Sequence, residues 1–133
     1  MYQVLVAIDG SEERALAQAD AVVDLADGRD DVGAVLLHVF NDNPEGASVH
    51  QIGAVRRARE RLEDAGVDVS LAEASGDPAE EILVSAGEVD ADLVSVAGRK
   101  RSPAGKVLLG SVSQQVLLNA DRPVLFTTTQ EST

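Results

Sequence analysis

Residues 2–8, Y-Q-V-L-V-A-I, constrain the fold of this chain more than any other segment. They form an almost uninterrupted apolar run, which is typical of a strand buried on both faces. Such strands occur in the middle of parallel sheets, whereas a half-exposed antiparallel strand alternates apolar and polar residues. We therefore expect an α/β fold with residues 2–8 as a central strand.

Strand and helix patterns then alternate along the chain. Residues 67–72 alternate apolar and polar side chains, so we expect this strand at an edge of the sheet. Strands joined by right-handed helical crossovers predict a doubly wound open sheet of five parallel strands in the order 3-2-1-4-5, with helices on both faces. The expected strands are residues 2–8, 32–40, 67–72, 92–97 and 122–127.

Capping residues mark two helix starts. Ser11 can accept a hydrogen bond from the first turn of a helix, and Glu12 in that turn complements the helix dipole. Asp77 as the N-cap, Pro78 at the first helical position and Glu80 at the third form a stronger signal. The sequence thus predicts helices directly after the first and third strands.

The stretch 98–113, G-R-K-R-S-P-A-G-K-V-L-L-G-S-V-S, carries special chemistry. It lies between an apolar run and a helical pattern, which is where open parallel sheets bind ligands. It also concentrates positive charge in an acidic chain. The basic residues are Arg99, Lys100, Arg101 and Lys106. An anion is the ligand that this basic stretch predicts.

The end of the basic stretch predicts a phosphate site. Gly110 and Ser111 stand before a helix, whose first N–H groups and dipole attract anions. Ser111 with Gln114 fits the capping box S-x-x-Q, so Ser111 is the expected N-cap. In the 3-2-1-4-5 order, Asp9 faces the same crevice. Asp9 either accepts hydrogen bonds from ligand hydroxyls, which we favour, or serves only the start of the next helix.

Length and composition narrow the class of protein. The 133 residues suit one domain, and no apolar run approaches the roughly 18 to 20 residues of a membrane-spanning helix. Cysteine is absent from the sequence, which excludes disulfides, thiolate nucleophiles and cysteine-ligated metals. Because the chain begins directly in a predicted strand, we expect no signal peptide and a cytoplasmic protein.

The charge balance is strongly acidic, with 23 Asp and Glu against 11 Lys and Arg and a net charge of -12. Such a surface suits either a halophilic protein, which we favour, or an ordinary acidic cytosolic one. It argues against nucleic acid as a partner, and nothing suggests a membrane partner. The arginines of residues 56–61 should lie on a solvated helix face, with Arg56–Glu60 and Arg59–Glu63 as ion pairs.

The common nucleotide-binding motifs are missing, since neither G-x-x-x-x-G-K-[ST] nor G-x-G-x-x-G occurs in the sequence. His38 lies in an apolar strand and His50 in a polar segment, and neither has a second ligand at metal-binding spacing. We expect both to be ordinary core or surface histidines. No nucleophile with a recognisable base stands out, so we assign no catalytic residue and no metal ligand.

Six short motifs, in order over nearly the whole chain, carry a family resemblance. They are Asp9 after V-L-V-A-I, L-L-H-V at 36–39, G-D-P-A-E-E-I at 76–82, A-D-L-V-S-V-A-G at 91–98, L-L-G-S-V-S at 108–113 and R-P-V-L at 122–125. Together they resemble the universal stress protein family, as a single-domain, haloarchaeal-like member. The resemblance implies the 3-2-1-4-5 fold over residues 1–133, a homodimer through the last strand at residues 124–127, and ATP or AMP, with or without Mg²⁺, in the crevice.

By that resemblance, Asp9 would meet the ribose, Val39 would offer its main chain to the adenine, and glycines and serines would hold the phosphates. The candidate nucleotide-binding residues are Ala7, Ile8, Asp9, Val39, Gly98, Lys100, Arg101, Gly110, Ser111, Val112 and Ser113. The chain departs from the family's phosphate loop at Arg101, which stands at the second glycine position, one residue closer to Gly110 than in the family pattern. The guanidinium of Arg101 could replace the lost main-chain contacts.

Three functions remain open at this point. The first, which we favour, is a regulatory stress-response protein that binds ATP or AMP between strands 1 and 4 and acts through partner interaction rather than turnover. The second is a dimeric interaction module without nucleotide, whose basic stretch docks a partner. The third is a slow ATPase or a self-phosphorylating protein with Ser111 or Ser113 as the acceptor.

Overall fold

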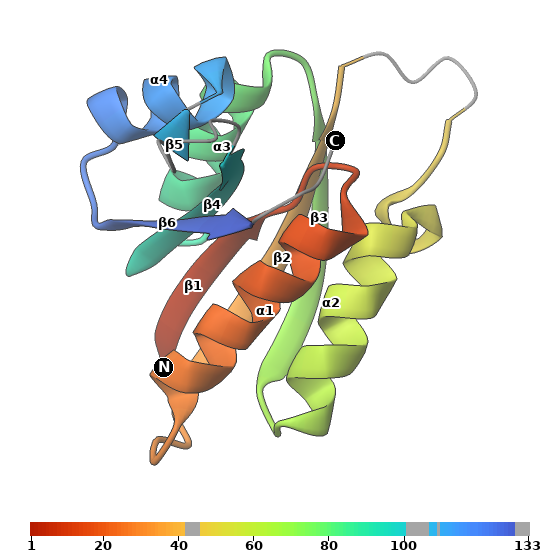
Figure 1. The fold of residues 1–133 in the computed structure, drawn as a ribbon, viewed down its shortest axis with the longest axis vertical. Helices are drawn as coiled ribbons and strands as arrows, with labels where there is room; N and C mark the ends of the chain where they lie inside the picture. Colours follow the sequence, from red (N-terminus) through yellow and green to blue (C-terminus); the bar gives the residue numbers. More distant parts are fainter. Residues whose placement is uncertain (42–45, 101–106, 109, 130–133) are drawn as a thin grey trace.

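The computed structural model describes residues 1–41, 46–100, 107–108 and 110–129. Figure 1 shows a twisted sheet with helices on both faces. The strands are β1 (Tyr2–Ala7), β2 (Val32–Phe40), β3 (Asp68–Ser75), β4 (Leu93–Lys100), β5 (Val107–Leu108) and β6 (Val124–Thr129), and the helices are α1 (Glu12–Ala26), the short 3-10 helix η1 (Val49–Gln51), α2 (Gly53–Asp64), α3 (Pro78–Glu88) and α4 (Ser111–Asn119). Within these ranges, no helix has the length and apolar character needed to cross a membrane.

The parallel strands follow the order β3-β2-β1-β4-β6. This confirms the predicted 3-2-1-4-5 order, with β6 as the fifth parallel strand. β1 is central, and β3 lies at an edge, as the alternation of its residues predicts. The short β5 is an element that the sequence pattern does not predict. It pairs antiparallel with the end of β4, where Arg99 lies between Leu108 of β5 and Thr129 of β6.

Successive side chains of the central strands point to opposite faces of the sheet and contribute to two hydrophobic cores. On one face, Val4 and Val6 of β1 pack with residues of α1 and α2. On the other face, Leu5 of β1 and Leu37 of β2 pack with residues of α3 and α4. Leu5 is fully buried, like its neighbours on both sides. Both faces of β1 are therefore covered, which is the reason why its sequence is almost continuously apolar.

Two helix starts agree with the sequence and one does not. Ser11 accepts a hydrogen bond from the main-chain N–H of Arg14 at 3.2 Å, and Asp77 caps α3 in the same way. The prediction of Ser111 as the N-cap of α4 is wrong. The N-cap is Gly110, whose carbonyl accepts the N–H of Gln114 at 3.0 Å. The helix thus begins one residue earlier than the S-x-x-Q spacing requires.

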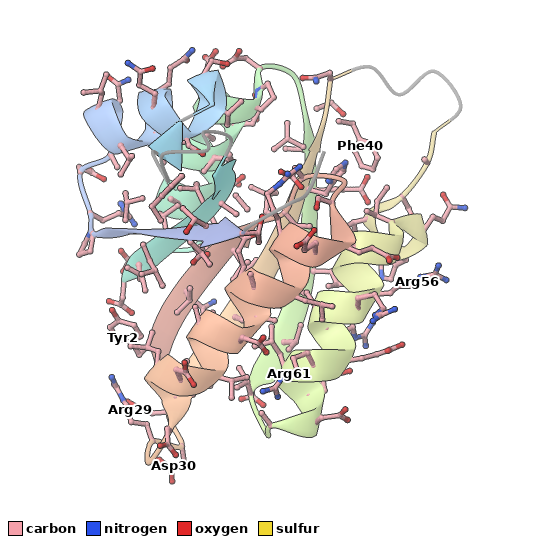
Figure 2. The ribbon with its side chains drawn as sticks, viewed as in Figure 1. Tyr2, Arg29, Asp30, Phe40, Arg56 and Arg61 are labelled. Carbon is pink, nitrogen blue, oxygen red and sulfur yellow. The ribbon has the colours of Figure 1, made fainter. Side chains whose placement is uncertain are left out.

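The arginines of α2 lie on its solvent-facing side, as expected, but of the two predicted ion pairs the described residues show only Arg59–Glu63 and not Arg56–Glu60. Arg59 pairs with Glu63 one turn later at 3.3 Å. Arg61 pairs with Asp20 of α1 at 2.8 Å and so joins the two helices that Figure 2 shows side by side. Arg56 points away from α2 in the same view. Such exposed pairs add little to stability, so the packing of α1 against α2 depends on their apolar faces.

The amino-terminal end of β1 lies at the opposite end of the sheet from the predicted site. There Arg29, in the turn after α1, stacks over the ring of Tyr2 at 4.9 Å and pairs with Asp31 at 3.1 Å (Figure 2). The hydrogen bond from the Arg29 side chain lowers the pKa of the Asp31 carboxyl group. These contacts fix the connection from α1 to β2 and leave the other end of the sheet for a ligand.

Candidate functional site

A cavity of about 1100 Å³ opens at the carboxyl ends of the central strands. β1 and β4 pair only as far as Val6 beside Ser95. Beyond this point β1 leads to α1 on one face of the sheet, and β4 leads on to α4 on the other. This is the position at which open α/β sheets bind ligands. The volume is slightly above the ~300–1,000 Å³ that is usual for small-molecule sites.

Nine of the eleven candidate residues line this cavity. They come from the ends of three strands and from the first turn of α4. They are Ala7, Ile8, Asp9, Val39, Gly98, Gly110, Ser111, Val112 and Ser113. Lys100 is the last residue of β4, beside β5, and Arg101 lies outside the described residues. The structure therefore brings together segments that are far apart in the sequence, as the sheet order predicts.

The first turn of α4 gives the cavity a wall of main-chain donors. Its N-cap, Gly110, makes no side-chain capping bond. Ser111, Val112 and Ser113, whose N–H groups are the first three of the helix, all line the cavity. Such donors, together with the positive end of the helix dipole, suit an anionic group. A Cβ atom at Gly110 would have no atom within 4 Å, so packing does not require a glycine there.

Two other candidates have structural partners of their own. The hydroxyl of Ser113 is buried and donates to the carbonyl oxygen of Ala97 at 3.3 Å, so the main-chain N–H is the group that Ser113 offers to a ligand. At Gly98, a Cβ atom would lie only 2.7 Å from Cζ of Phe126. The glycine is therefore required for packing of β6 against β4, in addition to any role beside a ligand.

Asp9 is held by its own helix start. Its Oδ1 accepts the N–H of Ser11 and its Oδ2 accepts Nε of Arg14, both at 2.8 Å. These contacts support the helix-start role, but each carboxylate oxygen keeps a further lone pair for a ligand hydroxyl. Arg14 also lines the cavity, and its ion pair offsets a negative charge that would repel an anion. Sequence reasoning missed Arg14, although its place one turn after the Ser11 cap was a usable signal.

The end of β2 supplies an exposed main-chain edge. The carbonyl of Leu37 accepts the N–H of Ile8 at 2.8 Å, and the carbonyl of Phe40 accepts the N–H of Gly76 at 3.0 Å on the other side. Because successive residues of a strand face opposite neighbours, the N–H and carbonyl groups of Val39 face the side of β1. β1 has ended there, so these groups face the cavity.

The remaining wall of the cavity is largely apolar, and sequence reasoning missed most of it. Residues from β2, β4 and α3 contribute to it, and apart from His38 none of them has reactive chemistry that a motif would reveal. The additional lining residues are Gly10, Leu37, His38, Phe40, Asn41, Pro78, Ile82, Val96 and Ala97. An apolar wall with a few convergent polar groups is typical of a small-molecule site.

The chain is a doubly wound α/β protein with a cavity between its central strands, at the position where such folds bind ligands. The chain belongs to the universal stress protein family, whose model, "Universal stress protein family", matches residues 1–127. A universal stress protein of Mycolicibacterium smegmatis is 35% identical over 99 residues, which cover 73% of this chain and 76% of that protein.

Solved structures of the same family have a similar fold. A universal stress protein from Archaeoglobus fulgidus superposes with a TM-score of 0.77 at 26% identity, covering 96% of this chain and 98% of that one. A universal stress protein in complex with cAMP gives a TM-score of 0.72 at 28% identity, covering 96% of this chain and 97% of that one. The predicted family and the predicted fold are both confirmed.

Proposed function

We propose that this chain is a small stress-response regulatory protein that binds ATP or AMP in the cavity between β1 and β4. It acts by nucleotide-dependent interaction with a partner rather than by turnover, and residues 1–133 form its single nucleotide-binding domain. The observation that carries the proposal is that one cavity has both main-chain N–H donors, from the start of α4, and an apolar wall. The similar structure in complex with cAMP supports it.

The residues of the cavity fit the three parts of an adenine nucleotide. Phosphates suit the N–H groups of residues 111–113, where charge and donors coincide. The second lone pairs of the Asp9 carboxylate suit ribose hydroxyls. An adenine ring suits the apolar side, where the main chain of Val39 offers both a donor and an acceptor. We further expect Lys100 and Arg101 to reach the phosphates, because Lys100 is the last residue of β4 and Arg101 is the next residue in the sequence.

The experiment is to denature the purified protein and assay the supernatant for adenine nucleotides, then to incubate fresh protein with radiolabelled ATP. Bound nucleotide without phosphate release or covalent label supports the proposal. Steady phosphate release would identify an ATPase, and label on the protein would identify self-phosphorylation. Absence of adenine nucleotide from the supernatant, together with no phosphate release and no label on the protein, would contradict the proposal and favour the interaction module.

We also propose a homodimer through β6, at residues 124–127. β6 is the outer strand of the sheet beyond β4, and an uncovered apolar edge favours pairing with another chain. A charged residue at Leu125 or Phe126 is a poor test, because both side chains pack against the cores. The N–H of Val94 bonds the carbonyl of Pro123 at 3.0 Å, so the N–H of Thr128 points to the open edge.

We therefore expect Thr128→Pro to convert the dimer to a monomer with little loss of stability, because proline removes only an edge donor. Sedimentation velocity at high salt measures the species present. Thr127→Pro is the matched variant, and it should instead unfold β6, since its N–H faces β4. A wild-type protein that sediments as a monomer at tens of micromolar would contradict the dimer.

The charge of the chain leads to a salt prediction. With 23 acidic against 11 basic residues, repulsion opposes the compact state unless ions screen it. We expect the melting temperature to rise steadily with added KCl, as in a halophilic protein. Thermal melts at increasing KCl measure this directly, and a flat or falling dependence would show that the protein is an ordinary acidic one.

A further inference from the structure

The two main-chain carbonyl groups at the carboxyl end of β1 are held by side chains rather than by the neighbouring strands. Pairing with β4 ends at Val6 beside Ser95, and pairing with β2 ends at Ala7 beside Leu37. By the alternation of the ladder, the carbonyl of Ala7 faces β4 and the carbonyl of Ile8 faces β2. Both need a partner beyond the end of the strand pairing, because a buried main-chain carbonyl without one is costly.

Gln18 of α1 supplies the partner on the β4 side. Its side chain is buried, with 1% of its surface exposed. Its Nε2 lies 3.0 Å from the Ala7 carbonyl oxygen, 3.3 Å from the Ser95 carbonyl oxygen and 3.1 Å from Ser95 Oγ. One amide group thus bridges β1 and β4 at the point where the two strands separate to form the cavity.

His38 of β2 supplies the partner on the other side. Its Nδ1 lies 2.8 Å from the carbonyl oxygen of Ile8. Because a carbonyl only accepts, Nδ1 must carry the proton. The ring edge also meets Phe40, with centroids 4.7 Å apart at 79°. A continuing β1–β2 ladder would give the Ile8 carbonyl to the N–H of Val39, so the imidazole leaves that N–H to the cavity.

We propose that Gln18 and His38 are the positioning residues of the nucleotide site. Together they clamp the two carbonyl groups that precede Asp9, and so they fix the position of the Asp9 carboxylate. They also keep the main-chain N–H and carbonyl groups of Val39 open to the ligand. Each acts through the main chain of β1. This inference rests on the proposed function and deepens it, since it says what shapes the site between the diverging strands.

The first test is Gln18→Met, which keeps the size of the side chain and removes its donors. We expect a weaker affinity for ATP, by roughly tenfold or more, because the Ala7 carbonyl loses its partner and the end of β1 moves. Val22→Ala is the matched control, since Val22 is a fully buried residue one turn further along α1 and does not line the cavity. It should lower the melting temperature similarly and keep ATP affinity within about threefold of wild type.

The second test compares His38→Asn with His38→Leu. The asparagine amide can donate from about the position of Nδ1, whereas leucine has no donor. We expect His38→Asn to restore most of the ATP affinity that His38→Leu loses. Equal losses of ATP affinity in both variants would overturn the clamp. An ATP affinity that falls only in step with the melting temperature across all the variants would also overturn it, because the role of the two residues would then be merely structural.

Hydrogen exchange of the nucleotide-free protein separates this inference from the proposed function. The N–H groups of Ile8 and Ser11 are bonded to Leu37 and to Asp9, so they report directly on the end of β1. We expect Gln18→Met to accelerate their exchange selectively, and Val22→Ala to leave it close to that of wild type. If wild type binds no nucleotide, the proposed function fails, whereas unselective exchange in Gln18→Met overturns the clamp.

Discussion

Gly110→Val should abolish nucleotide binding and leave the fold intact. Gly110 has an extended conformation, with φ -66° and ψ 162°, which valine adopts readily, and a Cβ atom there would have no neighbour within 4 Å. The residue lines the cavity directly before the first N–H groups of α4, so the added methyl groups would occupy the space that phosphates need. Losing even two charge-assisted hydrogen bonds predicts an affinity loss of roughly 100-fold or more. Calorimetric titration with ATP, together with a thermal melt, measures both effects.

The matched control for this prediction is Gly87→Val. Gly87 is an exposed residue of α3 that likewise has no atom within 4 Å of an added Cβ, and it does not line the cavity. This variant should keep its helix stability or gain slightly, because valine favours a helix more than glycine does, and it should bind ATP as wild type does. If Gly110→Val also bound ATP as wild type does, the phosphates would not lie at the start of α4.

Leu5→Ala should destabilise the protein by about 2–5 kcal/mol, the usual cost of a cavity in a core. Leu5 is fully buried in the central strand, in the core that α3 and α4 cover. Leu118→Ala, at a position that is 74% exposed, should change stability by no more than about 0.5 kcal/mol. Urea denaturation of both variants gives the comparison, and a loss below about 1 kcal/mol for Leu5→Ala would contradict the central position of β1.

The parts of the fold that local chemistry determines were predictable from the sequence. A strand covered on both faces must be apolar throughout, which identifies residues 2–8, and Asp77 with Pro78 marks α3 because each satisfies a requirement of a helix start. The start of α4 was not predictable in this way, since Gly110 and Ser111 are both acceptable N-caps. The end of β4 was missed as well, because pairing with β5 and β6 extends it to Lys100 despite the polar residues there.

The residues of the candidate site divide in the same way, into those that local sequence patterns predict and those that depend on contacts between distant segments. Residues near the expected strand ends, such as Asp9 and Gly98, were placed at the cavity because the sheet order brings strand ends together. Gln18 and His38 were not found as site residues. The pattern of an apolar strand makes His38 an ordinary core or surface histidine, and its bond to Ile8 depends on how two strands end. Gln18 lies 77 positions from Ser95, and no local pattern reports such a contact.

The most direct test of the central claim is calorimetric titration of the wild-type protein with ATP, AMP and adenosine at one fixed high salt concentration. The account predicts one site per chain for ATP and AMP, and clearly weaker binding of adenosine, because adenosine lacks the phosphates that the N–H groups of α4 would hold. Equal affinity for adenosine and ATP would contradict the phosphate site, and no binding of any of the three would contradict the proposed function as a whole.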